Sequence, residues 1–189
     1  PWAEMARFTR SGGEANAVAI RIARAYTGKD KVAICGYHGW HDWYLSSNID
    51  GKNSLKKHLM DQVPVSGVPN ILKNTVYPFE YNNFSQLKNI ISKNDIGVIK
   101  MEVQRNERPK DNFLKKIRKI ANDKKIILIF DECTSGFRET YGGLHKLYNI
   151  NPDMAIFGKA LGNGYAINAI IGKKSIMEKC NSTFISSTF

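Results

Sequence analysis

The segment IILIFDECTSGFR, residues 126–138, places two adjacent carboxylates, Asp131 and Glu132, at the end of the most hydrophobic run in the chain. The apolar, β-branched residues predict a buried strand, and an ionised carboxylate is costly to bury without a partner. Two explanations are open. Either both acids face solvent in a loop, or one of them faces a cation that comes from outside the chain.

A lysine and two histidines follow other apolar runs. Lys159 ends the run MAIFGK and opens a glycine-rich turn, where a lysine can lose its proton and act as a nucleophile, although most lysines are surface residues. His38 and His41 lie in GYHGWHD, and no third ligand is spaced to join them. We therefore expect no bound metal and assign both histidines to solvent or to supporting contacts.

The turn Ser11-Gly12-Gly13 opens a predicted helix whose apolar stripe ends at Gly28. Ser11 can be explained as a simple N-cap. The two glycines, however, expose backbone N–H groups at the positive end of the helix, which is a suitable cradle for a phosphate.

Helices and strands alternate along the chain. We expect strands within 31–37, 96–103, 126–131, 154–159 and 168–172, helices over 12–27 and 112–124, and an irregular excursion over 45–75. This alternation predicts an α/β fold with a mostly parallel sheet and helices on both faces. Parallel sheets bind ligands at the carboxyl ends of their strands, where Tyr37, His38, Asp131 and Lys159 lie.

Together these features suit one cofactor. A phosphate cradle, an aromatic ring, a strand-end carboxylate and a strand-end lysine are what pyridoxal 5′-phosphate requires. The external cation facing Asp131 would then be the protonated ring nitrogen of that cofactor.

The chain resembles the class III aminotransferases of PLP fold type I, the aspartate aminotransferase-like fold. Within them it is similar to the glutamate-1-semialdehyde 2,1-aminomutase group. The resemblance rests on SGGEANAVAIRIARAYTGKDK, GYHGWHD, IFDECTSGFR, PDMAIFGKALGNGY and SSTF. It implies that residues 1–189 are an incomplete large PLP-binding domain without its small-domain segments, and that the protein is a homodimer.

The resemblance also implies roles for individual residues. Lys159 would form the Schiff base with the cofactor and shuttle a proton, and Asp131 would pair with the ring nitrogen. The other implied cofactor-binding residues are Ser11, Gly12 and Gly13 at the phosphate, Tyr37, His38 and Cys133 around the ring, Glu102 as the strand-end glutamate near the active site, and Thr188 reaching the phosphate of the neighbouring subunit. Asn106 is a weaker match for a residue near the ring hydroxyl.

Several positions depart from the family pattern. Gly13 stands where threonine is usual, Val103 where a proline follows the glutamate, and Cys133 where a branched aliphatic residue is usual. The alternatives are therefore an aminomutase, an aminotransferase acting on another carbonyl such as a keto-sugar, and a non-catalytic PLP-fold domain. The pairing of Lys159 with Asp131 argues against the last. A nicotinamide-binding domain lacks its GxGxxG signature.

The composition limits the partners and the location. The net charge of +11 accompanies lysines spread over solvated helical patterns, with no interleaved aromatic platform, so we expect no nucleic-acid partner. No apolar run is long enough to span a bilayer, and three widely spaced cysteines indicate a reducing, cytoplasmic setting. The expected partners are a small-molecule amino donor and a carbonyl acceptor.

Overall fold

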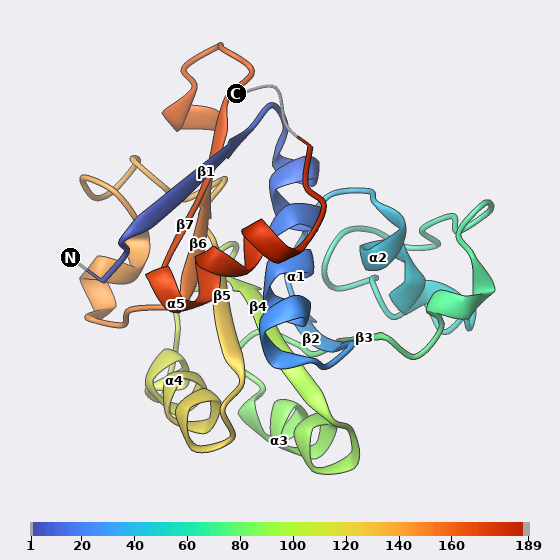
Figure 1. Ribbon diagram of the computed structural model, residues 1–189. Coiled ribbons are helices and arrows are strands. Elements are labelled where there is room, and N and C mark those ends of the chain that lie inside the picture. Colours follow the sequence, from blue (N-terminus) through green and yellow to red (C-terminus); the bar gives the residue numbers. More distant parts are fainter. Residues whose placement is uncertain (1, 187–189) are drawn as a thin grey trace.

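A seven-stranded sheet forms the centre of the computed structural model, which describes residues 2–186 (Figure 1). The strands run in the order β1-β7-β6-β5-β4-β2-β3. Their bounds are β1 Met5–Thr9, β2 Lys31–Cys35, β3 Val76–Pro78, β4 Ile96–Glu102, β5 Ile127–Asp131, β6 Met154–Phe157 and β7 Asn168–Gly172. β2, β3, β4, β5 and β6 are mutually parallel, while β7 is antiparallel to both β1 and β6.

Short and long helices connect these strands. The α-helices are α1 Gly12–Thr27, α2 Asp42–Leu45, α3 Phe84–Lys93, α4 Phe113–Asp123 and α5 Lys174–Met177. Single 3₁₀ turns are η1 Ser46–Asn48, η2 Asn70–Leu72, η3 Leu144–Tyr148, η4 Lys159–Leu161 and η5 Glu178–Ser182. Within residues 2–186, every helix is too short or too polar to span a lipid bilayer.

Successive residues of a strand pack alternately in two separate hydrophobic cores, one on each face of the sheet. Ile127 and Ile129 of β5 pack in the core that contains the buried face of α1, whereas Leu128 and Phe130 pack in the core that contains α4. This two-residue alternation is what a strand covered on both faces requires. Figure 1 shows α1 and α5 crossing in front of the strands, with α3 and α4 at the bottom.

The first long helix has well-defined ends. Ser11 is its N-cap and accepts a hydrogen bond from the backbone N–H of Glu14 at 3.2 Å. Gly28 ends it in the left-handed conformation, with φ +68°, where glycine carries no steric penalty. The first residues of this helix, Gly12 and Gly13, lie near Asp131 at the carboxyl end of β5.

The predicted α/β fold with a mostly parallel sheet and helices on both faces is confirmed. The expected strands and both expected helices are present, and residues 45–75 contain only short turns. The sequence interpretation did not include β1, β3, α3 or α5.

Candidate active site

The carboxyl ends of four adjacent parallel strands lie at one edge of the sheet. The strands are β2, β4, β5 and β6, and the residues at or just after their ends include Tyr37, Glu102, Asp131 and Lys159. The register places Glu102 of β4 directly beside Asp131 of β5. The topology thus gathers residues that are more than a hundred positions apart in the sequence.

A cavity of about 230 Å³ opens at this edge. It is lined by Gly12, Gly13, Asn16, Tyr37, Gly39, Trp40, Asp131, Cys133, Thr134, Lys159 and Asn168. The amine, the carboxylate, the aromatic ring and the two helix-opening glycines that the sequence singled out therefore share one cavity.

Asp131 is buried in this site, with 4% of its surface exposed. Its Oδ2 atom accepts hydrogen bonds from His38 Nδ1 at 2.9 Å and from Lys100 Nζ at 3.1 Å, and its Oδ1 atom accepts from the backbone N–H of Cys133 at 3.1 Å. Lys100 lies on β4 and is itself completely buried. Asp131 therefore has a counterion within the chain, which the sequence interpretation did not include, and its contact with a cation from outside the chain stays a prediction.

The electrostatics of this cluster keep Asp131 ionised. Burial alone raises the pKa of the Asp131 carboxyl, but the charge of Lys100 and the hydrogen bond from His38 outweigh it and hold that pKa well below its usual range. Burial, followed by the charge of Lys100, lowers the pKa of His38 to about 4. A neutral His38 has one ring proton, and we place it on Nδ1 because that atom faces an ionised carboxylate.

One acceptor position of Asp131 stays available. A carboxylate offers about four lone-pair positions, two on each oxygen. Within residues 2–186, both positions on Oδ2 and one on Oδ1 receive donors. Since Asp131 lines the cavity, the remaining Oδ1 position can accept one more N–H group.

Lys159 projects from the turn η4 and is exposed. Its Nζ atom donates to Thr134 Oγ1 at 3.0 Å. Its backbone has φ +46°, in the left-handed region that a residue with a side chain rarely adopts. Such strain at a cavity wall is typical of functional positions.

The N-terminus of α1 forms the opposite end of the cavity. The first four N–H groups of a helix have no acceptor within it, and Gly12 and Gly13 provide two of them at the cavity wall. The hydroxyl of Ser11 is already engaged as the N-cap and does not line the cavity. A Cβ at Gly13 would lie 2.6 Å from the ring of His41, so His41 fills the space of the side chain usual in the family.

Glu102 supports the aromatic side of the site without lining this cavity. It is buried, with its Oε2 atom accepting from the backbone N–H of Tyr37 at 3.1 Å and from Arg105 Nη1 at 3.4 Å. Gly36 has φ +110°, and a Cβ there would lie 2.4 Å from the same Oε2 atom. The guanidinium of Arg105 in turn lies 5.9 Å from the ring centre of Tyr37.

Glu132, the second acid of the motif, has a structural role. It is completely buried, and its carboxylate accepts from the backbone N–H groups of Leu144 at 3.1 Å and His145 at 3.0 Å. It also contacts His145 Nδ1 at 2.9 Å and the hydroxyl of Ser135. Glu132 therefore fixes the loop that follows β5, away from the cavity.

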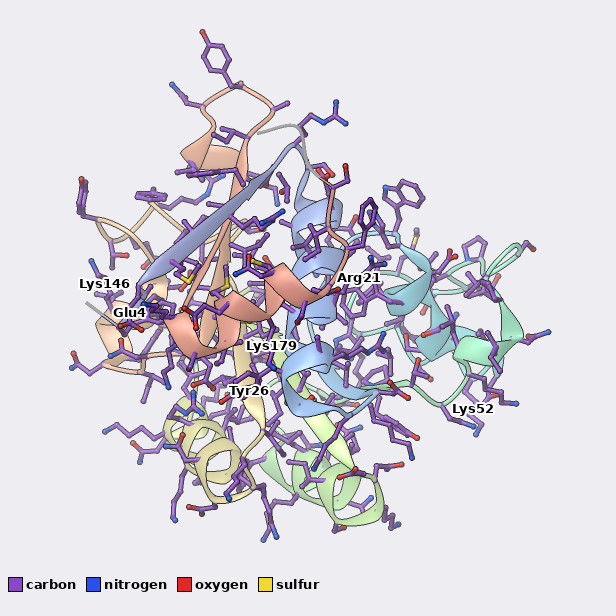
Figure 2. All side chains as sticks on the ribbon, in the orientation of Figure 1. Glu4, Arg21, Tyr26, Lys52, Lys146 and Lys179 are labelled. Atoms are coloured by element: carbon purple, nitrogen blue, oxygen red, sulfur yellow. The ribbon has the colours of Figure 1, made fainter. Side chains whose placement is uncertain are left out.

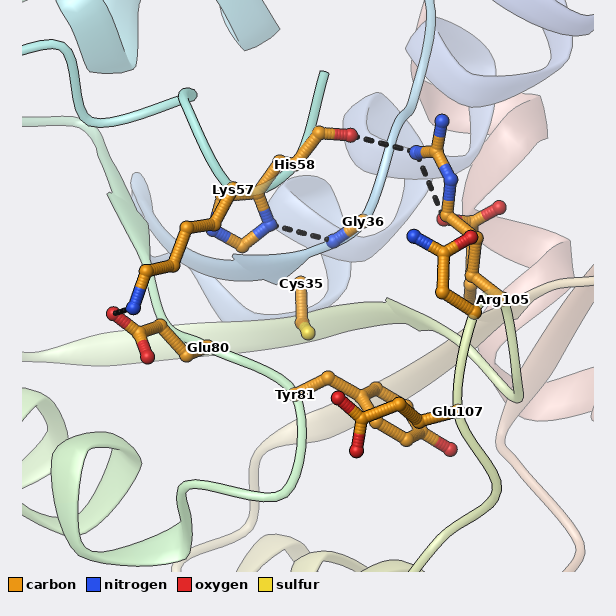
Figure 3. A pocket seen from close by; sticks show the side chains of 10 residues that line it. Cys35, Gly36, Lys57, His58, Glu80, Tyr81, Arg105 and Glu107 are labelled. Atoms are coloured by element: carbon orange, nitrogen blue, oxygen red, sulfur yellow. Dashed lines mark hydrogen bonds and ion pairs between the residues drawn. The ribbon is translucent and has the colours of Figure 1, made fainter. Parts of the chain in front are cut away.

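A second cavity, of about 340 Å³, is lined in part by Gly36 and Glu102 (Figure 3). Figure 3 shows His58 accepting from the Gly36 N–H and Lys57 pairing with Glu80. Arg105 there donates to the carbonyl of His58 at 2.6 Å. Lys57 and Glu80, and Arg105 and Glu102, thus pair within this cavity, and Lys159 and Asp131 are not among its lining residues.

The predicted site residues fall into three groups. Gly12, Gly13, Tyr37, Asp131, Cys133 and Lys159 line the smaller cavity; His38, Ser11 and Glu102 lie directly behind or beside it; and Asn106 lines the larger cavity. Thr188 lies outside the described residues. Cys133 is partly buried, and this burial, together with the charge of Asp131, raises the pKa of its thiol.

The sequence interpretation missed Lys100 and the lining residues Asn16, Trp40, Thr134 and Asn168. A signal for Lys100 was present, because a lysine inside an apolar strand, two positions before Glu102, must lie on the same face and needs a carboxylate partner. Among residues 2–186, no group of three or more His, Cys, Asp and Glu side chains could hold a metal. His38 bonds Asp131, and His41 stacks on Trp40 with ring centres 4.9 Å apart.

The basic side chains labelled in Figure 2 come from several elements. Arg21 lies on α1, Lys52 follows η1, Lys146 lies on η3 and Lys179 lies on η5. The positive charge that these residues carry is thus spread over four different segments of the chain.

Comparisons with known proteins agree with this geometry. A family model described as aminotransferase class-III matches residues 1–189. A 3-aminobutyryl-CoA aminotransferase from Cloacimonas acidaminovorans is 40% identical over 201 residues, covering 100% of this chain and 44% of that protein. A glutamate-1-semialdehyde 2,1-aminomutase from Methanobrevibacter smithii is 39% identical over 186 residues, covering 94% of this chain and 42% of that protein.

A solved transaminase with PLP bound has a TM-score of 0.78 and 26% identity, covering 92% of this chain and 41% of that chain. The chain therefore spans less than half the length of these relatives. The family match, in contrast, covers every residue and confirms the resemblance drawn from the motifs. On these grounds the chain belongs to the class III aminotransferase family.

Proposed function

We propose that the protein carrying this chain transfers an amino group between small molecules with pyridoxal 5′-phosphate, which Lys159 holds covalently. One observation carries the proposal. A single cavity brings together the amine of Lys159, an ionised Asp131 with one open acceptor position, and the N-terminus of α1.

The residues of the cavity suit this cofactor. Two glycine N–H groups at a positive helix end match a phosphate, and the open position on Asp131 Oδ1 matches a ring N–H donor. Tyr37 and Cys133 provide the aromatic and apolar walls that a planar ring needs. Bound there, the cofactor would supply an electron sink for negative charge on a substrate carbon.

The chain's own residues then have distinct tasks. Lys159 Nζ binds the cofactor and later moves a proton. Its hydrogen bond to Thr134 Oγ1, at 3.0 Å, fixes its position. Asp131 holds a proton on the partner nitrogen, because a carboxylate with a depressed pKa does not take that proton itself. His38 orients Asp131 through Nδ1, and Glu102 holds the backbone of Tyr37.

The two relatives named above carry out different reactions at nearly equal identity, so likeness alone does not separate an aminomutase from an aminotransferase. We propose an aminotransferase or aminomutase that accepts a small amino donor and a carbonyl acceptor. We further propose residues 1–189 as the large domain of a cytoplasmic homodimer with neither nucleic acid nor membrane as a partner. The isolated chain, less than half the length of its relatives, should then bind the cofactor weakly and show no turnover.

The test uses full-length protein containing this chain, loaded with cofactor and mixed with single amines, amino acids and amino aldehydes. Conversion of the aldehyde form of the cofactor to its amine form by one class identifies the donor. Lys159→Arg should abolish the conversion, whereas Lys146→Arg, which alters a lysine whose Nζ donates to the Tyr141 carbonyl away from the cavity, should preserve it. Equal rates for wild type and Lys159→Arg would refute the proposal.

A further inference from the structure

Lys100 is a charged group that the proposed reaction does not use. Lysine is almost never fully buried unless it is paired. Lys100 has no exposed surface, lies in the middle of β4, and places Nζ 3.1 Å from Oδ2 of Asp131. The structure thus places a lysine ammonium group behind Asp131, which lines the proposed cofactor cavity.

We propose that Lys100 is a positioning residue that shares the carboxylate of Asp131 with the cofactor's ring nitrogen and weakens the hold of that nitrogen on its proton. This inference rests on the proposed function, since it assumes that the cofactor occupies the cavity. Lys100 would thereby set how strongly the cofactor ring attracts electrons from the substrate.

The two carboxylate oxygens of Asp131 have different partners, which supports this role of Lys100. Oδ2 accepts from Lys100 Nζ and His38 Nδ1, while Oδ1 accepts from the backbone N–H of Cys133 and belongs to a residue that lines the cavity. A ring N–H bound at Oδ1 would therefore be the second positive group on a single negative charge. Two cations that share one anion each lower the proton affinity of the other.

Among the groups around Asp131, Lys100 is the main positive charge that competes with the ring nitrogen for the carboxylate. His38 is neutral above a pH of about 4, and Cys133 is a thiol whose pKa burial raises. Glu102 lies beside Asp131 in the sheet, where burial raises the pKa of its carboxyl, and Arg105 partly balances its charge. Without Lys100, the ring nitrogen would therefore face an uncompensated carboxylate.

The experiment loads full-length protein with ¹⁵N-labelled pyridoxal 5′-phosphate and follows the ring-nitrogen resonance against pH. Lys100→Met keeps most of the side-chain length without the charge and should raise the pKa of the ring nitrogen by roughly one to three units. Arg118→Met is the matched control. It removes a cation that pairs with buried Asp153 at 2.9 Å, away from the cavity, and should leave the ring-nitrogen pKa unchanged.

A second measurement does not depend on the folding of Lys100→Met. In wild type, the ¹⁵Nζ resonance of Lys100 should shift on cofactor loading, because the carboxylate is then shared. An unchanged or lowered ring-nitrogen pKa in Lys100→Met, or an unmoved Lys100 resonance in wild type, overturns the assignment. Borohydride labelling of Lys159 in the same wild-type samples separates the two proposals. If Lys159 carries no label, the proposed function fails. If Lys159 is labelled but the nitrogen measurements give an overturning result, only the role of Lys100 fails.

Discussion

The ring of His38 donates from Nδ1 to Oδ2 of Asp131 across 2.9 Å, and both side chains are buried at the carboxyl end of the sheet. The two residues lie 93 positions apart in the sequence. Because His38 follows β2 and Asp131 ends β5, only the parallel arrangement of the sheet brings them together. The hydrogen bond fixes the carboxylate that we assign to the ring nitrogen.

Replacing Asp131 with asparagine should lower turnover of the full-length protein by several powers of ten, while cofactor remains bound. The amide keeps the size of the side chain but loses the charge that retains the proton on the ring nitrogen. Turnover and cofactor content are measured on the same sample. Asp153→Asn is the control, since Asp153 is a buried, ion-paired aspartate away from the cavity. Near-normal turnover in Asp131→Asn contradicts the assignment.

Acid should destabilise the chain through His38. Burial lowers the pKa of His38 from 6.5 to about 4, so the unfolded chain binds more protons than the folded chain between these values. The free energy of unfolding should therefore fall as the pH drops from 6.5 towards 4, by up to about 1.4 kcal/mol per pH unit for one proton.

His38→Gln keeps a donor for Asp131 without titrating, so its unfolding free energy should depend on pH less steeply by about one proton. Burial also lowers the pKa of His58 to about 4, and His58→Gln should remove a second proton in the same range. Chemical denaturation at several pH values measures both slopes. An unchanged slope in His38→Gln would show that the buried ring does not titrate as described.

The strands that position the site were predictable from the sequence, whereas the edges of the sheet were not. Buried strands such as β4 and β5 are continuous apolar runs, which the sequence displays directly. β1 alternates buried and exposed residues and β3 has three residues, so neither has a strong signal of its own. Both are strands because a neighbouring strand offers hydrogen bonds, which is a property of the tertiary structure.

The same difference applies to the site. Asp131, Lys159 and the glycines at Gly12 and Gly13 could be predicted because they end or begin strong local elements. The pairing of Lys100 with Asp131 could not be placed in this way, because it depends on the register between β4 and β5. Sequence patterns identify which residues carry charge, but the neighbours of each charge are set by the sheet.

Gly36→Ala should destabilise the protein and disturb Tyr37. Gly36 has φ +110°, and a Cβ there would lie 2.4 Å from Oε2 of Glu102. Gly67→Ala is a matched control, because Gly67 has φ +91° but no heavy atom within 4 Å of the added Cβ. The alanine at 67 should cost about 1 kcal/mol of unfolding free energy from backbone strain alone.

The alanine at 36 should cost roughly 1–3 kcal/mol more, because the carboxylate of Glu102 must move. Thermal or chemical unfolding of the two variants compares these costs. Equal losses for Gly36→Ala and Gly67→Ala would mean that Glu102 does not occupy the space beside Gly36.

The covalent attachment of the cofactor at Lys159 is the central claim, and borohydride reduction tests it most directly. Full-length protein loaded with pyridoxal 5′-phosphate is reduced, digested and mapped by mass spectrometry, with Lys159→Arg treated in parallel. The account predicts one modified peptide, which contains Lys159, and no modification at the cavity in Lys159→Arg. A label on Lys100 or on any other lysine, with Lys159 unmodified, would contradict it.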